Sequence, residues 1–212
     1  MSLIHKTTLT PTKVDLLANW LPAQPWFVPQ GAGPELTTSG GFRLDDPQGE
    51  VGIEFLVVTD TAGARPRSYH VPLTYRGAPL EGAEKALVGT AEHGVLGRRW
   101  VYDGAHDPLV VSQVLAFLHG RAEAQQQRVS HTPDPSVGRH LAPDTPEVEA
   151  PAEPAISSGP DGTDIALGPL VLTVARLLDP AAEDEEAVGR VVSRWETPHG
   201  AHRAPFFVLR RR

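Results

Sequence analysis

The chain has 212 residues, no cysteine, and 26 acidic against 19 basic side chains, for a formal net charge of −7 at pH 7. This length allows one or two domains with a sizeable core. The lack of cysteine excludes disulfides and thiolate metal sites, and the negative charge argues against general affinity for nucleic acid or anionic lipid. No segment resembles a signal peptide or approaches the roughly 20 apolar residues of a membrane span. We therefore expect a cytoplasmic protein that binds neither nucleic acid nor membrane.

A short helix is predicted first, with Thr10 or Thr12 as its cap and Pro22 at its end. Its apolar residues recur at helical spacing: Val14, Leu17, Ala18 and Leu21. The Pro- and Gly-rich stretch 23–41 predicts an ordered loop anchored by Trp26 and Phe27. The aromatic group of this loop and Trp20 fits either packing under the helix or a sugar platform, and packing is the preferred interpretation.

The stretch 50–76 predicts a central hairpin with strands at Val51–Thr59 and Ser68–Tyr75. Both faces of the first strand are largely apolar, which indicates a strand in the interior of a sheet. Pro72 removes one hydrogen-bond donor from the second strand, so we expect a bulge or a sheet edge there. A strand at Gly41–Leu44 leads into this hairpin through a turn.

Two more strands are expected near Lys85–Thr90 and Leu96–Tyr102. Asp107 and Pro108 then predict a helix start, because a capping carboxylate precedes proline at the first helical position. The helix has a wide apolar face and should lie across the sheet. A further strand is possible at Glu123–Val129.

Residues 131–160 differ from the rest, because prolines and acidic residues dominate and large apolar side chains are almost absent. Such a segment buries too little surface to offset its ordering entropy, which predicts a disordered, extended linker. Beyond it, strands are expected at Asp164–Leu178, Ala187–Glu196 and Ala204–Leu209. They would form a small β extension that docks on the first domain.

Catalytic motifs are absent from the sequence. There is no phosphate-binding glycine loop, nucleophile elbow or kinase catalytic loop. His199 and His202 have a spacing that could suit a metal, but they lie in an apparent turn without a third ligand, so no metal is expected. We therefore expect neither an enzyme nor a cofactor.

Two histidines have carboxylates near them in the sequence, and each could form an acid–base pair. His93 follows Glu92, whereas His106 lies between Asp103 and Asp107. Asp107 is better explained as a helix cap and Asp103 as a turn residue, so the structural interpretation is preferred for His106.

Four segments occur in an order that resembles the N-terminal cap domain of maltokinases. They are Trp20–Pro22, Trp26–Phe27, Tyr69–Leu73 and Tyr102–Pro108. The resemblance covers about residues 10–130 and is closest to stand-alone proteins with a maltokinase N-terminal cap-like domain. It implies a cystatin-like fold, in which a curved antiparallel sheet packs against a helix.

The chain departs from the family pattern in two respects. Pro25 stands where the cap usually has a basic residue, and the kinase body that would follow the cap is not recognisable. The resemblance therefore implies a non-catalytic accessory or regulatory module that acts with a sugar kinase or another enzyme of maltose, trehalose or glucan metabolism.

The predicted architecture is α+β, with a cap-like domain at 1–130, a linker at 131–160 and a β extension at 161–212. The predicted binding surface is the exposed side of the central hairpin together with the loop near Trp26, with Tyr69, His70 and Arg76 as contacts. The alternative function is binding of a sugar or sugar phosphate on the concave face of the sheet, lined by Arg98, Trp100 and Tyr102. The sequence leaves the oligomeric state and the pairing of the C-terminal strands open.

Overall fold

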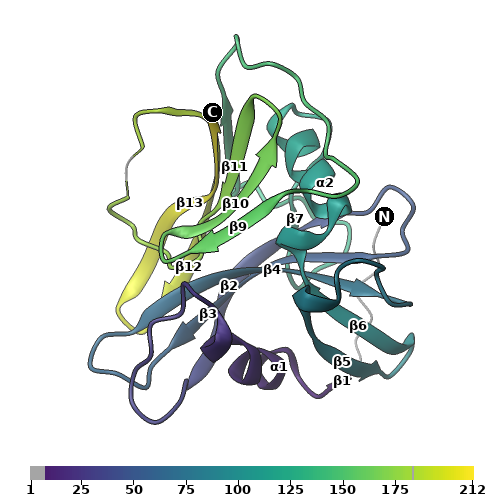
Figure 1. Ribbon diagram of the computed structural model, residues 1–212. Coiled ribbons are helices and arrows are strands. Elements are labelled where there is room, and N and C mark those ends of the chain that lie inside the picture. Colours follow the sequence, from purple (N-terminus) through teal and green to yellow (C-terminus); the bar gives the residue numbers. More distant parts are fainter. Residues whose placement is uncertain (1–7, 183) are drawn as a thin grey trace.

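The computed structural model describes residues 8–182 and 184–212, and Figure 1 shows their arrangement. The helices and strands follow one another in the order β1 (Leu9–Thr10), α1 (Lys13–Trp20), η1 (Leu21–Ala23), β2 (Leu36–Asp45), β3 (Gly52–Asp60), β4 (Arg67–Arg76), η2 (Glu84–Ala86), β5 (Leu87–His93), β6 (Gly97–Asp103), η3 (Gly104–His106), α2 (Pro108–Leu118), β7 (Gln125–Gln126), β8 (Gly138–Leu141), β9 (Ile156–Gly159), β10 (Gly162–Leu167), β11 (Leu170–Val174), β12 (Ala187–Thr197) and β13 (Gly200–Arg211).

All strands of the described residues belong to one antiparallel sheet. Its order is β1-β5-β6-β4-β3-β2-β12-β13-β11-β10-β9, while β7 pairs with β2 and β8 pairs with β12. The predicted strands at 51–59 and 68–75 correspond to β3 and β4, which pair from Gly52 to Asp60. The protein is rich in strands and has two short α-helices, which confirms the predicted α+β class in broad terms.

The segment after β11 returns to β4 and closes the central part of the sheet on itself. The amide of His70 donates to the carbonyl of Arg176 at 2.8 Å, and the amide of Leu178 donates to the carbonyl of Ser68 at 2.8 Å. These bonds occupy the N-terminal half of β4, whereas β6 pairs only with its C-terminal half from Leu73 onward. Pro72 lies where the pairing with β6 stops, so its missing donor costs no ladder hydrogen bond. This confirms the local edge expected from the sequence.

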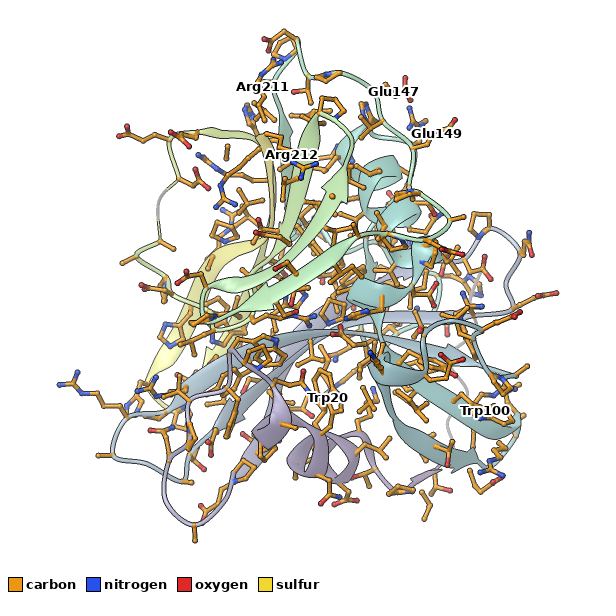
Figure 2. The ribbon with its side chains drawn as sticks, in the orientation of Figure 1. Trp20, Trp100, Glu147, Glu149, Arg211 and Arg212 are labelled. Carbon is orange, nitrogen blue, oxygen red and sulfur yellow. The ribbon has the colours of Figure 1, made fainter. Side chains whose placement is uncertain are left out.

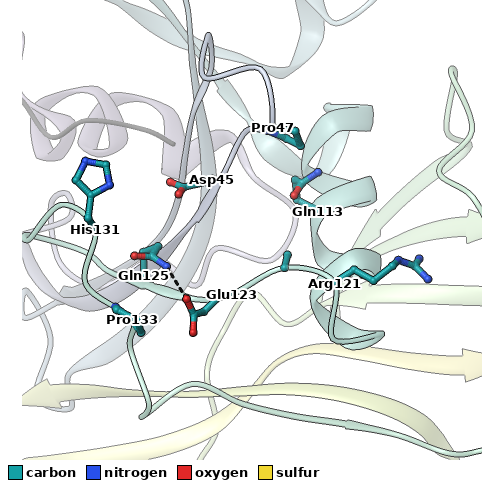
Figure 3. A pocket seen from close by; sticks show the side chains of 9 residues that line it. Asp45, Pro47, Gln113, Arg121, Glu123, Gln125, His131 and Pro133 are labelled. Atoms are coloured by element: carbon teal, nitrogen blue, oxygen red, sulfur yellow. Dashed lines mark hydrogen bonds between the residues drawn. The ribbon is translucent and has the colours of Figure 1, made fainter.

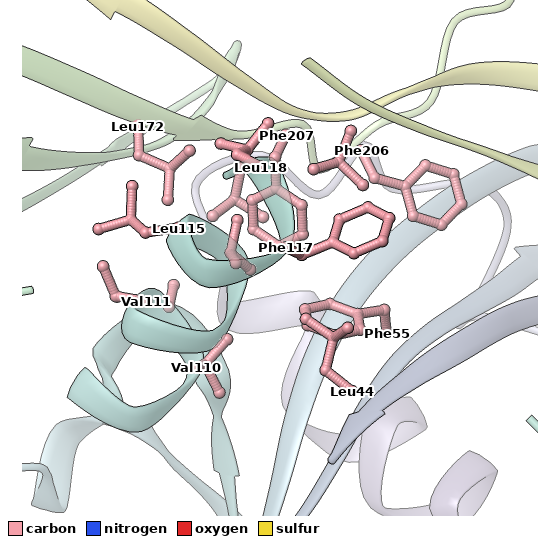
Figure 4. Close-up of a cluster of buried hydrophobic side chains, with 14 of the residues drawn as sticks. Leu44, Phe55, Val110, Val111, Leu115, Phe117, Leu118, Leu172, Phe206 and Phe207 are labelled. Atoms are coloured by element: carbon pink, nitrogen blue, oxygen red, sulfur yellow. The ribbon is translucent and has the colours of Figure 1, made fainter. Parts of the chain in front are cut away.

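Helix α2 fills the space enclosed by the curved sheet. The carboxylate of Asp107 accepts from the amide of Leu109 and caps the helix, and Pro108 occupies its first position, as predicted. The large core cluster combines α2 with side chains of β2, β3 and β10–β13 (Figure 4). Its members come from both ends of the sequence, and Phe42 stacks on Phe55 while Phe55 meets Phe207 edge to face. The two ends of the chain therefore share one core.

A second core lies on the opposite face of β3 and β4, under α1. Thr12 and Asp15 form a capping box at the start of this helix, so the cap at Thr12 is confirmed. Leu16, Leu17 and Trp26 pack against apolar residues of the two strands. The hairpin β3–β4 is consequently covered on both faces, which is why both faces of β3 carry apolar side chains.

Residues 131–160 are not the disordered linker that the sequence predicted, because they run along the sheet and pair with it. Strand β8 pairs with β12 and β9 pairs with β10. Between them, the amide of Ala142 donates to the carbonyl of Val188 at 2.7 Å, and Val148 and Ala150 pack against the large core. A few small apolar residues and backbone hydrogen bonds supply the contacts that the composition alone did not suggest.

The C-terminal strands join the same sheet, with β12 next to β2. The single strand predicted at Asp164–Leu178 is instead the hairpin β10–β11, which turns at Gly168, where φ is +65°. Glycine adopts this left-handed conformation without the cost that a Cβ imposes. Residues 161–212 contribute Ile165, Phe206 and other side chains to the large core, so a chain ending at Val129 would lack one wall of that core.

Candidate functional site

Three predicted contact residues are buried in the interior. Trp26, Tyr69 and His70 are exposed by 1%, 0% and 0%. The ring of Tyr69 lies 6.0 Å from that of Trp26, and its hydroxyl meets the backbone of Val28. The prediction that one side of this hairpin is exposed is wrong, because α1 and the loop after it cover that face. These three side chains offer no surface to a partner in this structure.

His70 lies inside the large core. Its Nδ1 atom is 3.0 Å from the carbonyl oxygen of Ala175, and its ring lies 4.4 Å from that of Phe206. Burial and the nearby charge of Arg176 lower the pKa of His70 to about 3. The imidazole is therefore neutral and packs as an aromatic ring.

Arg76 has a structural partner. Its guanidinium donates two hydrogen bonds to the carboxylate of Asp107, at 2.7 and 2.8 Å. Asp107 is also the cap of α2, so the pair fixes the helix start against the end of β4. The capping role predicted for Asp107 is confirmed, and this bidentate contact occupies the charge of Arg76.

Asp103 and Arg176 form a buried ion pair that the sequence did not suggest. The Arg176 side chain is fully buried and donates to the Asp103 carboxylate at 2.6 Å and to the Thr163 hydroxyl at 2.9 Å. Its guanidinium also lies 4.9 Å from the ring of Trp26. Burial lowers the pKa of the neighbouring His106. Asp103 is thus committed to a charge pair that joins β6 to the segment after β11.

Of the residues expected to line a concave site, Arg98 stacks on Trp100, and Trp100 packs against the small cluster that buries Tyr102. The Arg98 guanidinium stacks over the Trp100 ring at 5.3 Å. Tyr102 is 3% exposed, and its hydroxyl accepts from the amide of Leu80 at 2.9 Å. Helix α2 and the large core pack on the concave side of the sheet (Figure 4), and none of the three predicted liners belongs to that core.

The tip of the β5–β6 hairpin exposes apolar side chains instead. Val95 and Leu96 are 60% and 46% exposed, and a third exposed large apolar side chain of the described residues, Val129 at 49%, lies outside this hairpin. The His93 imidazole accepts from the amides of Val95 and Leu96 at 3.3 and 3.0 Å, which holds the turn in one conformation. Figure 2 shows Trp100 on this side of the molecule, well away from Glu147 and Arg211.

Residues 20–107 match the family model described as the maltokinase N-terminal cap domain. The chain carries a maltokinase N-terminal cap-like domain. No curated protein matches the chain. The matched residues run from the end of α1 to the cap of α2, so the cap-like domain includes the hairpin β3–β4 and the exposed tip of β5–β6.

Two pockets flank this domain. One pocket of about 370 Å³ contains Arg67, Trp195, His199 and His202 in its wall. His202 stacks on Trp195 at 5.4 Å and makes a hydrogen bond of 2.8 Å with the Thr197 hydroxyl. No group of side chains among the described residues could hold a metal ion, so the paired histidines have no third ligand.

The other pocket, of about 420 Å³, lies between the end of β2, the middle of α2 and the segment 121–133. Polar side chains supply much of its wall (Figure 3): Asp45, Gln113, Glu123, Gln125 and His131. Only Asp45 and Pro47 of this wall fall within the cap-like match. The described residues contain no helix long and apolar enough to cross a membrane.

Proposed function

We propose that the chain is a non-catalytic accessory or regulatory module, which acts beside a sugar kinase or another enzyme of maltose, trehalose or glucan metabolism. The match of residues 20–107 to a maltokinase cap supports this proposal, since a cap domain in that family belongs to a kinase. The cystatin-like relationship of the fold and a cytoplasmic location are parts of the same proposal.

The observation that carries the proposal is the exposed tip of the β5–β6 hairpin. Neighbouring apolar side chains in water are unfavourable, and such patches mark interaction sites. Val95 and Leu96 form the patch, and the stacked pair Arg98–Trp100 lies beside it on β6. Aromatic and arginine side chains are the residue types that contribute most to protein interfaces.

The backbone of the tip is preorganised by its own hydrogen bonds. The contacts from His93 to the two amides of the turn, and from the Arg99 guanidinium to the carbonyl of Leu96 at 2.7 Å, fix the backbone before any partner binds. A preformed contact loses less conformational entropy on binding. The partner surface should therefore be an apolar depression that accepts Val95 and Leu96, with a carboxylate opposite Arg98.

The test is an affinity pull-down from the native cell extract with the full chain, followed by identification of the recovered proteins. We expect a sugar kinase or glucan enzyme to be recovered, and the double variant V95S/L96S to lose it. Loss of two central apolar contacts should weaken binding at least about tenfold.

Val129→Ser is the matched control, because Val129 is similarly exposed but lies outside the hairpin. Equal recovery by the double variant and this control would contradict the docking surface. Recovery of proteins without any role in sugar metabolism would contradict the proposed partner class.

A further inference from the structure

We propose that the pocket between β2, α2 and the segment 121–133 binds a neutral, hydroxyl-rich small molecule, that is, a saccharide or an open-chain polyol. This site is separate from the docking hairpin, because no residue of β5 or β6 contributes to its wall. Its volume of about 420 Å³ falls within the range of small-molecule sites.

Gln113 provides the strongest reason to expect a ligand. It lies on α2 among apolar residues and is only 8% exposed, and within the described part of the chain no hydrogen bond engages its side-chain amide. Figure 3 shows its side chain extending from α2 toward Asp45 across the pocket. Its amide is open to the pocket rather than sealed in the core, and a ligand hydroxyl could both donate to it and accept from it.

The opposite wall adds more hydrogen-bonding groups of both kinds. Gln125 is also 8% exposed, and its amide nitrogen lies 3.5 Å from the Glu123 carboxylate, which leaves hydrogen-bonding capacity on both groups. His131 also lies in the wall, where it already interacts with another group of the protein. Carboxylate and amide groups together suit hydroxyls, because each hydroxyl donates once and accepts twice.

The charges of the wall favour a neutral ligand over an anion. Asp45 and Glu123 contribute carboxylates, whereas the Arg121 guanidinium forms an ion pair with Glu147 at 2.5 Å, and Figure 3 shows it pointing away from the pocket. A phosphate group would be repelled by the exposed Glu123 carboxylate, and the Arg121 guanidinium is already paired with Glu147. The C–H surfaces of Pro47 and Pro133 provide apolar contacts for the ring or carbon chain of the ligand.

The test follows the side-chain amide signals of Gln113 and Gln125 in two-dimensional ¹H–¹⁵N spectra of the full chain. The signals are assigned by their loss in Gln113→Leu and Gln125→Leu. Maltose serves as a ring saccharide, mannitol as an open-chain polyol and maltose 1-phosphate as the anionic counterpart. We expect maltose or mannitol to shift both amide signals saturably, and maltose 1-phosphate to bind more weakly than maltose.

The variant Gln113→Leu should bind the preferred probe about tenfold more weakly, as expected for the loss of one buried hydrogen-bonding group. Gln48→Leu changes an exposed glutamine in the β2–β3 turn and should bind like the unchanged protein. The unchanged backbone signals of Gln113→Leu serve to show that the variant is folded. The proposal is overturned if neither neutral probe shifts these amides, if the phosphate ester binds more tightly than maltose, or if Gln113→Leu binds as well as Gln48→Leu.

Discussion

Two neighbouring hairpins of the cap-like domain have opposite environments. The hairpin β3–β4 lies in the middle of the sheet with a core on each face, whereas β5–β6 lies toward one edge and exposes Val95 and Leu96 at its tip. Their sequences differ accordingly, since β3 is apolar on both faces and β6 begins with exposed arginine and glycine. Both faces of β3–β4 are covered by the two cores, so this hairpin has little surface left for a partner. The surface available to a partner lies on the less apolar hairpin, β5–β6.

The buried hairpin also carries a carboxylate, Glu54, that depends on specific partners. Glu54 of β3 accepts from the Lys13 ammonium at 2.6 Å, from the Tyr75 hydroxyl at 2.6 Å and from the Gln127 amide at 2.9 Å. These contacts join α1, β3, β4 and the segment after β7. The exposed tip of β5–β6 does not rely on a buried ion pair of this kind. Mutations can therefore distinguish the two hairpins by their effect on stability.

The largest effect is expected where the segment after β11 meets the cap-like domain. Asp103→Ala leaves the fully buried Arg176 without its carboxylate partner. The free energy of unfolding should fall by about 3–5 kcal/mol, because a buried charge is left uncompensated. Urea unfolding measures this loss. Asp161→Ala removes an exposed carboxylate and should change stability by less than about 0.5 kcal/mol. Equal losses in the two variants would show that the ion pair does not hold these segments together.

The second effect depends on pH and involves His70 of the buried hairpin. The folded protein keeps this imidazole neutral down to a pKa of about 3, whereas an unfolded chain takes up the proton at about 6.5. Below pH 6.5 the unfolded state therefore binds more protons, so stability falls as the pH is lowered, by about 1.4 kcal/mol per pH unit. Above pH 6.5 this contribution is fully present.

His70→Phe should remove that slope and keep the packing against Phe206. Urea unfolding of both proteins between pH about 6.5 and about 4.5 tests this expectation. The lowered pKa of His106 gives a slope of the same sign in both proteins and cancels in the difference. His140→Gln, at an exposed position, should keep the slope of the unchanged protein. A slope that persists in His70→Phe would place the titrating group elsewhere.

A smaller effect is expected at Lys13, which supports the buried hairpin from α1. Burial pushes the pKa of Glu54 upward, but the Lys13 charge and the hydrogen bonds to the carboxylate together hold it below its ordinary value. Lys13→Met should reduce the free energy of unfolding by about 1–2 kcal/mol, less than for a fully buried pair because Lys13 is partly exposed. Lys85→Met, at an exposed lysine, is the control. An unchanged stability of Lys13→Met would mean that Tyr75 and Gln127 suffice for Glu54.

The smallest effect on stability is expected at the exposed hairpin. V95S/L96S should change the free energy of unfolding by no more than about 0.5 kcal/mol, since both side chains are largely in water already. Val57→Ser on the buried hairpin should cost several times more, because it puts a hydroxyl into the large core. Thermal unfolding followed by circular dichroism compares the two. A large loss in V95S/L96S would mean that the tip packs within the protein and is not free to dock.

Part of the fold follows from local signals in the sequence. The cap at Thr12, the Asp107–Pro108 start of α2 and the apolar pattern of β3 all depend on neighbouring residues, and the structure confirms each. The turn at Gly168 was missed, because an apolar run on both sides of it looked like one continuous strand. The candidate site was predicted less well: among the predicted contacts Arg98 is exposed, Trp100 and Arg76 are half-buried, and Arg76 is already paired with Asp107.

Local patterns along the chain were enough to predict the helix starts, the central hairpin and the motif order that matched the maltokinase cap. Which side chains are accessible depends on the packing of segments that are distant in the sequence. Trp26 and Tyr69 are buried by α1 and the loop after it, Asp103 pairs with Arg176 from the other end of the chain, and Gln113 faces a pocket. Capping and strand periodicity act within a few residues, whereas burial and pairing depend on segments that the folded sheet brings together from distant parts of the chain.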